Sequence, residues 1–232
     1  GFIGRNLKEY LKDKENYEVF APSHKEFDIA DETQVKREIG KCQYDVILHA
    51  AVFNPRVGKN NDASSEIEIN LRMYFNLAKY NDCFAKMFYF GSGAEFNKQN
   101  DLQMVDESYD SSIPATNYGF YKYIINQDIR NRDNIYNLRL FGLFGKYENW
   151  RKTFISGACC KALKNLPITI RQNVYFDYLY IDDFCRIVEW FINNNEHYKD
   201  YNIASGQRID LVTIAELIKS VSKKDIPVYV CN

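Results

Sequence analysis

The apolar positions along this chain follow two spacings in alternation. Residues 1–14 place apolar side chains three and four positions apart, which predicts a helix. Residues 44–51 (Y-D-V-I-L-H-A-A) form a nearly continuous apolar run, which is typical of a strand buried on both faces of a parallel sheet. The same two patterns recur up to Gly145, where they predict helices over 31–39, 64–80 and 118–130 and strands over 17–21, 86–90 and 136–141.

After Gly145 the predicted elements become shorter and less regular. The pattern there predicts helices over 153–163, 182–193 and 212–221 and strands over 168–171, 178–181, 201–203 and 228–230. Because strands and helices alternate along the first part of the chain, we predict an α/β fold with a doubly wound parallel (Rossmann-like) sheet. The later elements predict a smaller C-terminal lobe, from which some segments return to the sheet.

The composition excludes several classes of protein. The chain has 232 residues and a formal net charge of -1, without the basic excess of a nucleic-acid binder. No apolar run reaches the ~18 residues that a membrane helix needs, and the chain lacks a secretory start. Six cysteines without C-x-x-C spacing and only three histidines favour buried thiols in a reducing compartment over a metal centre. We therefore expect a cytoplasmic protein that binds no nucleic acid, no membrane and no metal.

The first four residues, Gly1, Phe2, Ile3 and Gly4, run directly into the first predicted helix. A dinucleotide-binding turn needs glycines at a helix N-terminus because the backbone must approach a pyrophosphate closely. Two glycines three apart also occur at ordinary helix starts, but the alternation that follows favours the dinucleotide turn. The central strand that precedes such a turn is missing, so we expect the given chain to begin inside its natural sequence.

Eight short motifs occur in a characteristic order and spacing. They are G-F-I-G (1–4), F-D-I-A-D (27–31), D-V-I-L-H-A-A (45–51), Y-F-G-S-G-A-E-F (89–96), Y-G-F-Y-K (118–122), N-L-R-L-F-G-L-F-G (137–145), Y-I-D-D (180–183) and Y-N-I-A-S-G (201–206). With them the chain resembles the extended short-chain dehydrogenase/reductases that act on nucleotide sugars. The resemblance implies a dinucleotide-binding domain over residues 1–145, a substrate lobe over 146–232, and truncation at both ends. It also implies a homodimer and a role in making polysaccharide precursors.

The family's Tyr-x-x-x-Lys signature matches Tyr118 and Lys122. Chance alone gives roughly 1.5 such pairs in a chain this rich in both residues, and Tyr10 with Lys14 is a second match on the first predicted helix. Tyr118 differs because Ser92 precedes it at the end of a buried strand, where open α/β sheets bind their ligands. An ammonium one helical turn away would lower the pKa of Tyr118. Tyr118 would then exchange a proton with a substrate carbonyl that Ser92 polarises.

Departures from the family's patterns narrow the reaction. The 4,6-dehydratases carry an Asp-Glu pair where this chain has Gly93 and Ala94, and strand alternation would turn Glu95 to the other side. The epimerase-reductases similar to GDP-fucose synthase use a Cys at the position of Ala94 and a later His that this chain lacks. Two reactions stay open: reduction of a 4-keto sugar with Tyr118 as the proton donor, or 4-epimerisation with a retained NAD. An alternative of another class is a non-catalytic dinucleotide sensor or scaffold.

The predicted strand over 17–21 is followed by Ser23, His24 and Lys25, and not by the acidic residue that favours NAD. A hydroxyl, an imidazole and an ammonium suit the 2′-phosphate of NADP, so we expect NADP, with NAD as the alternative. The resemblance implies further dinucleotide contacts, which would come from Asp28, Ile29, Ala50, Ala51, Tyr118 and Lys122.

The substrate side is marked less clearly. Many family members have Asn where this chain has Gly142 and Arg where it has Phe176. The candidate contacts to a nucleotide-sugar substrate are Gly93, next to Ser92, and Arg171, which could reach a diphosphate. The altered positions leave open a substrate that is not a standard nucleotide sugar.

Overall fold

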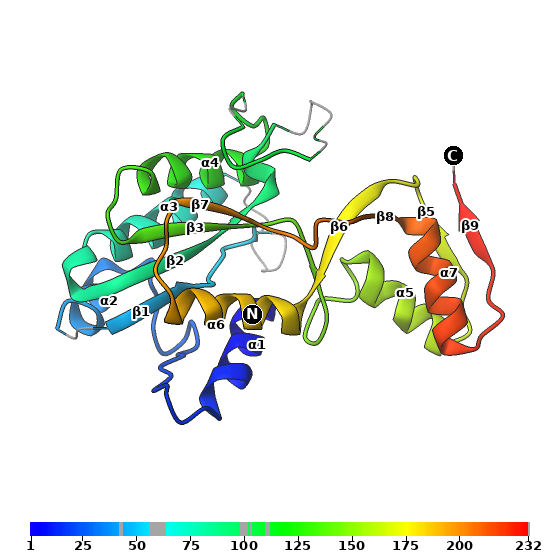
Figure 1. Cartoon of the computed structure of the whole chain (residues 1–232), viewed down its shortest axis with the longest axis horizontal. Helices are drawn as coiled ribbons and strands as arrows, with labels where there is room; N and C mark the ends of the chain where they lie inside the picture. The colour runs from blue at the N-terminus through cyan, green and yellow to red at the C-terminus, as the bar shows by residue number, and fades with distance from the viewer. Residues whose placement is uncertain (42–43, 56–63, 98–101, 103, 110–111, 232) are drawn as a thin grey trace. The chain divides into compact units, whose positions relative to one another are not determined.

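The computed structural model describes residues 1–41, 44–55, 64–97, 102, 104–109 and 112–231 (Figure 1). Its contacts divide the chain into two compact units. The sheet unit comprises Glu15–Leu140 and Glu189–Ile203, and the lobe unit comprises Gly1–Lys14, Phe141–Val188 and Ala204–Asn232. The division falls within helix α6 (Ile181–Asn193), which contributes residues to both units.

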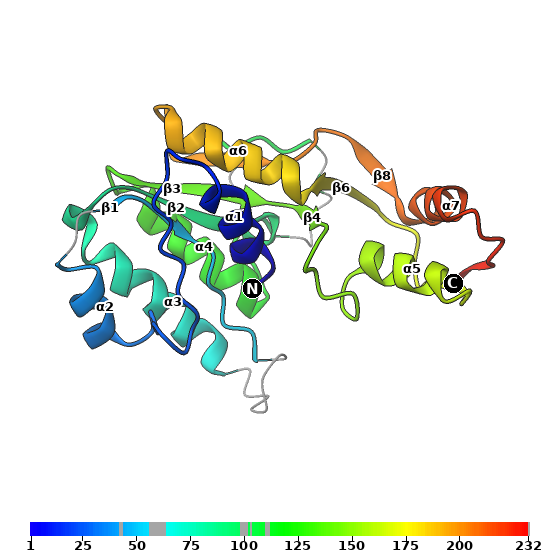
Figure 2. The same cartoon turned by 90° about the horizontal axis from the view of Figure 1, so that it is seen from below.

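The sheet unit is built on four parallel strands in the order β1-β2-β3-β7. They are β1 (Tyr44–His49), β2 (Phe84–Ser92), β3 (Ile135–Leu140) and β7 (Asp200–Ile203). Figure 2 shows on one side of this sheet the helices α2 (Glu32–Glu38), α3 (Ser65–Ala78) and α4 (Asn117–Ile129). Two 3₁₀ turns flank strand β2, and they are η2 (Asn81–Cys83) and η3 (Gly93–Glu95).

Strand β2 is apolar almost throughout because its side chains fill both faces of the sheet. Met87 and Tyr89 belong to the core formed with α2, α3 and α4. Phe88 contacts Phe191 of α6 and Tyr136 of β3 instead. Removal of these large side chains from water is the main source of stability for the sheet unit. The doubly wound parallel sheet predicted from the sequence is confirmed.

The lobe unit holds short elements around a second core. Its helices besides α6 are α1 (Phe2–Lys12), α5 (Phe154–Leu163) and α7 (Leu211–Ser222). Strands β4 (Gly142–Phe144), β6 (Tyr175–Tyr180) and β8 (Arg208–Asp210) form one small sheet, and β5 (Ile168–Ile170) pairs with β9 (Val228–Val230). Ala158 and Ala162 of α5 pack with Ile168 of β5. Helix α1 is tied to this unit by Asn6, whose Nδ2 donates to the carbonyl of Lys146 (2.8 Å).

Residues 1–14 therefore group by contact with the lobe unit, whereas the predicted boundary at residue 145 places them with the sheet. Strand β7, from late in the chain, belongs to the sheet unit through its pairing with β3. The assignment of residues 1–145 to the dinucleotide and of 146–232 to the substrate stays a prediction.

The secondary structure corrects the predicted elements at two places. Residues 17–21 form no strand, because no described strand lies beside them to complete a ladder of hydrogen bonds, and β1 is the edge of its sheet. Strands β4 and β8 are absent from the predicted elements because three residues are too few to show an alternation. No helix in the described part of the chain combines the length and the apolar character needed to cross a membrane.

Candidate active site

Ser92 stands at the carboxyl end of strand β2, where the chain turns into η3. Its Oγ accepts a hydrogen bond from the backbone N–H of Ala94 (3.2 Å). Its own backbone N–H donates to Oε1 of Glu95 (2.9 Å), which completes a reciprocal capping box. The position of the Ser92 hydroxyl is therefore fixed by its nearest neighbours in the sequence.

Helix α4 brings Tyr118 to this turn. The helix begins after Thr116, whose side chain accepts a hydrogen bond from the backbone N–H of Gly119 (3.1 Å). Gly119 lies so close to the carbonyl of Ala94 that a Cβ at this position would clash with it. A glycine here lets the first turn of α4 approach η3, which brings Tyr118 close enough to Ser92 for the two side chains to interact.

Lys122 lies one helical turn further along α4 and is buried. Its Nζ donates a hydrogen bond to the carbonyl of Phe90 in β2 (2.6 Å). The same atom lies 4.3 Å from the ring centroid of Tyr89 and 5.9 Å from that of Tyr118. Burial lowers the pKa of Lys122 to about 7, and the charge of Glu95 opposes this effect. Lys122 therefore changes its charge close to neutral pH.

The pKa of Tyr118 is shifted in the direction opposite to the one expected from the sequence. Although 37% of the residue's surface is exposed, burial of its hydroxyl end is the largest influence and raises the pKa above 10.0. The interaction with Ser92 opposes this rise in pKa, while the charges of Glu95 and Glu66 add to it. The expected lowering by Lys122 is not among these influences, because a lysine with a pKa of about 7 is neutral at the pH where Tyr118 loses its proton.

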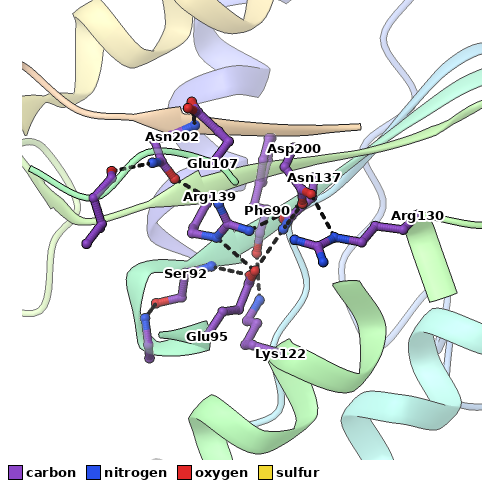
Figure 3. A network of polar contacts seen from close by, with 12 residues as sticks. Phe90, Ser92, Glu95, Glu107, Lys122, Arg130, Asn137, Arg139, Asp200 and Asn202 are labelled. Atoms are coloured by element: carbon purple, nitrogen blue, oxygen red, sulfur yellow. Dashed lines mark hydrogen bonds and ion pairs between the residues drawn. The ribbon is translucent and has the colours of Figure 1, made fainter. Parts of the chain in front are cut away.

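Glu95 is a site residue that the sequence did not reveal (Figure 3). Strand β2 ends at Ser92 and the next three residues form a 3₁₀ turn, so the strand alternation assumed for Glu95 does not apply. Its carboxylate is buried and pairs with Arg139 of β3, whose Nε lies 2.9 Å from Oε2. The pair could have been predicted from one sequence pattern: an acidic residue lies directly after one buried strand, and an Arg lies inside the next.

The pair belongs to a polar network along β3 and β7, which Figure 3 shows. Arg139 also bonds Oδ1 of Asp200 (3.3 Å) and Oδ1 of Asn202 (2.8 Å). Asn137 donates from Nδ2 to Oε2 of Glu95 (2.9 Å) and to Oδ1 of Asp200 (3.3 Å). The network therefore links the turn after Ser92 to the edge strand β7.

Ala50 and Ala51 directly follow β1, which is the parallel neighbour of β2. Parallel strands end at the same edge of a sheet, so these two small residues share an edge with Ser92. Asn70 of α3 holds the next stretch of chain, because its side chain accepts from the N–H of Phe53 (3.0 Å) and donates to its carbonyl (2.9 Å).

His49, the last residue of β1, is buried beside the ring of Tyr89. Burial lowers its pKa to about 3, and the charge of Lys122 acts in the same direction. Neither ring nitrogen has a hydrogen-bond partner among the described residues. His49 is therefore uncharged at neutral pH, which does not suit a general acid or base.

Ser23, His24 and Lys25 lie in a turn of the sheet unit. The N–H of Ser23 donates to Oε2 of Glu26 (2.7 Å). Nδ1 of His24 lies 3.6 Å from Oδ1 of Asp28, and the His24 side chain is 81% exposed. Lys25 is exposed as well. The imidazole and the ammonium are thus both accessible to an anion.

The other predicted contacts lie in structural roles or in the lobe unit. Asp28 accepts from the N–H of Ala30 (2.9 Å), and Ile29 packs against the core of the sheet unit. Residues 1–4 open helix α1, and a Cβ on Gly1 would meet nothing within 4 Å. Arg171, just after β5, is exposed. Of the predicted residues, the structure brings four together, namely Ser92, Gly93, Tyr118 and Lys122.

Comparisons with known proteins identify a matching family and similar folds. The model of the NAD dependent epimerase/dehydratase family matches residues 1–204. Among similar solved structures is the dTDP-4-dehydrorhamnose reductase of Bacillus anthracis in complex with NADP, with 20% identity, a TM-score of 0.85, and coverage of 99% of this chain and 81% of that chain. The GDP-L-fucose synthetase of Naegleria fowleri bound to NADP has 17% identity, a TM-score of 0.84, and coverage of 99% and 78%. The GDP-mannoheptose C4 reductase of Campylobacter jejuni with NADP bound has 16% identity, a TM-score of 0.83, and coverage of 99% and 83%.

Proposed function

The chain belongs to the NAD dependent epimerase/dehydratase family, and on that premise we propose that it is an NADP-dependent oxidoreductase that reduces the 4-keto group of a nucleotide-linked sugar. The observation that carries the proposal is the approach of Tyr118 on α4 to Ser92 at the carboxyl end of a parallel strand. The buried Lys122 lies one turn along the same helix. A phenol, a hydroxyl and an ammonium are the groups that ketone reduction needs around the carbonyl oxygen.

Each of the three side chains has a distinct part in this reaction. When bound, NADPH supplies the hydride. Tyr118 gives its proton to the carbonyl oxygen, and burial, which raises its pKa, keeps the donor protonated beforehand. The Ser92 hydroxyl donates a hydrogen bond to the same oxygen, and its capping box holds it in place. The reaction leaves Tyr118 as a phenolate, which a protonated Lys122 stabilises.

The residues present fit NADP. Lys25 offers exposed positive charge to a 2′-phosphate, and His24 and Lys25 both offer hydrogen-bond donors; charge-assisted bonds to phosphate are strong. Ala50 and Ala51 leave room at the sheet edge where ligands of open α/β folds bind. Similar structures solved with NADP include a C4 reductase and a 4-dehydrorhamnose reductase, which supports 4-keto reduction. For the substrate we propose Gly93, next to Ser92, as a contact, and a contact with Arg171 stays a separate prediction.

The test replaces the proposed proton donor. We expect Tyr118→Phe to lower kcat for reduction of 4-keto nucleotide sugars by about 10²–10⁴-fold while NADPH affinity, followed by fluorescence, is retained. Tyr121→Phe on the same helix is the matched control, because its buried hydroxyl has no hydrogen-bond partner among the described residues. Full turnover by Tyr118→Phe would overturn the assignment of the donor.

The fluorescence titrations and the turnover assay together separate the reductase from the 4-epimerase. A reductase consumes one NADPH for each sugar and binds NADPH more tightly than NADH. A 4-epimerase returns the hydride to the sugar, so that it interconverts two sugars with no net loss of reduced cofactor. Binding of the dinucleotide with turnover of no sugar at all would favour a sensor or scaffold.

A further inference from the structure

Glu95 and Arg139 form an ion pair that the proposed mechanism does not use. The two side chains are 2% and 1% exposed, and Nε of Arg139 lies 2.9 Å from Oε2 of Glu95. Taking two charges out of water is costly, and a well-packed apolar pair often stabilises a fold equally well. A buried pair directly after the Ser92 position therefore points to a role beyond stability.

The two carboxylate oxygens of Glu95 have different partners. Oε1 accepts from the backbone N–H of Ser92 (2.9 Å), and Oε2 accepts from Asn137 Nδ2 and Arg139 Nε (both 2.9 Å). A Cβ on Gly91 would clash with Oε1, so the carboxylate lies directly against the backbone of β2. Glu95 thus fixes the stretch of backbone that carries the Ser92 hydroxyl.

Among the described residues, one charged neighbour shifts the pKa of Lys122. The uncharged side chains around its Nζ are aromatic, and they are Tyr89, Tyr118, Tyr121 and the neutral His49. The charged neighbour is Glu95, which favours the ammonium form of Lys122 while burial disfavours it. The charge on Lys122 therefore depends on the charge on Glu95.

We propose that Glu95 is a positioning residue of this active site, which holds Ser92 through its backbone and presents the negative charge that keeps Lys122 an ammonium. The inference rests on the proposed function, in which Lys122 stabilises the Tyr118 phenolate. Burial raises the pKa of Glu95, and the neighbouring Arg139 guanidinium is the strongest influence against that rise. Arg139 in this arrangement favours the ionised form of the carboxylate.

Asp200 of β7 provides a matched control. It is a second carboxylate on Arg139, with Oδ1 3.3 Å from Nη2, and its Oδ2 lies 3.0 Å from Nε of Arg130. Neither Ser92 nor Lys122 is among its hydrogen-bond partners in the described part of the chain. Asp200→Asn therefore removes a carboxylate from the same network without removing the one that faces Lys122.

The first experiment measures the titration of Lys122 by NMR on the full chain labelled with ¹³C at lysine Cε, with Lys122→Met to assign the signal. We expect Glu95→Gln to lower the pKa of Lys122 from about 7. Loss of an adjacent negative charge disfavours the ammonium, and we expect a fall of about one unit. Asp200→Asn should leave the titration in place. An unmoved titration in Glu95→Gln, or an equal shift in both variants, would overturn the proposal.

A second variant separates the charge of Glu95 from its geometry. Glu95→Asp keeps the charge, but its shorter side chain cannot reach Ser92 and Arg139 together. We expect it to leave the Lys122 titration unchanged and to lower kcat for ketone reduction by about 10–100-fold, because the Ser92 hydroxyl loses its fixed position. Unchanged kcat in Glu95→Asp would overturn the proposal that Glu95 positions Ser92. If Glu95→Gln does not fold, Glu95→Asp tests the proposal by itself.

The pH dependence of the reaction gives a readout that a purely structural role would not move. Reduction requires a protonated Lys122, so the alkaline limb of kcat/KM should move to lower pH in Glu95→Gln and stay in place in Asp200→Asn. A wild-type chain that binds NADPH but reduces no 4-keto sugar would overturn the proposed function. The lysine titration needs no turnover, so it would still decide whether Glu95 acts on Lys122.

Discussion

The turn after Ser92 and the turn around His24 are both proposed to act on bound ligands, yet they are built in opposite ways. At Ser92 the supporting side chains of Glu95 and Lys122 are buried, and both have partners on strands, Arg139 of β3 and the carbonyl of Phe90 in β2. At His24 the side chain is 81% exposed and its contact with Asp28 is local. Side chains that position the proposed catalytic groups are thus held by several partners. Side chains proposed to select NADP over NAD are exposed, so a substitution there should disturb few other contacts.

The same substitution in the two regions should have different effects. We expect Lys122→Met to lower kcat by about 10²–10⁴-fold, because the phenolate left on Tyr118 loses its cation. Lys25→Met should leave kcat unchanged and raise the KM for NADPH by about tenfold, through loss of one charge-assisted hydrogen bond to phosphate. Steady-state kinetics with NADPH measures both effects. A lower kcat in Lys25→Met would contradict the assignment of catalysis to the Ser92 region and of cofactor binding to the His24 region.

Breaking a buried and an exposed ion pair should differ in the free energy of unfolding. Arg139→Met leaves the buried Glu95 carboxylate without its main partner, and we expect a loss of about 3–5 kcal/mol. Arg186→Met removes the partner of Asp183, in a pair whose side chains are 65% and 45% exposed, and its cost should stay within about 1 kcal/mol. Urea unfolding followed by circular dichroism compares the two variants. Equal costs would mean that the Arg139 network is dispensable.

Two glycines offer the smallest change, the addition of one methyl group. A Cβ on Gly91 would clash with Glu95 and Asn137, so we expect Gly91→Ala to cost about 1–3 kcal/mol of stability. A Cβ on Gly1 would meet nothing within 4 Å, so Gly1→Ala should leave stability unchanged. Thermal unfolding measures both effects. If the backbone of Gly1 does approach a pyrophosphate, a titration of Gly1→Ala with NADPH will show weaker binding in a normally folded protein.

The sequence predicted the long, buried elements well, and the match to the NAD dependent epimerase/dehydratase family confirms the resemblance. Strand β1 and helix α4 have apolar patterns long enough to identify them. Residues 17–21 show where prediction from apolar runs fails, because such a run predicts a strand whether or not a partner strand lies beside it.

The interactions within the candidate site were harder to predict from the sequence than the residues that form it. The partner of Glu95 lies 44 positions away, so no local pattern contains the pair. The end of β2 at Ser92 also removed the alternation on which the orientation of Glu95 was judged. The direction of the Tyr118 pKa shift depended mainly on the burial of its hydroxyl end, which no local sequence pattern specifies.

The late return of strand β7 to the sheet has a consequence for synthesis on the ribosome. Asp200 and its partner Asn137 are 63 positions apart, and the intervening chain supplies most of the lobe unit. When β3 leaves the exit tunnel, the guanidinium of Arg139 is already present, but its second carboxylate has not been made. The nascent sheet therefore pairs β3 with β7 and gains this carboxylate only after the lobe segment between them has emerged, which is the slow, non-local step expected to limit folding.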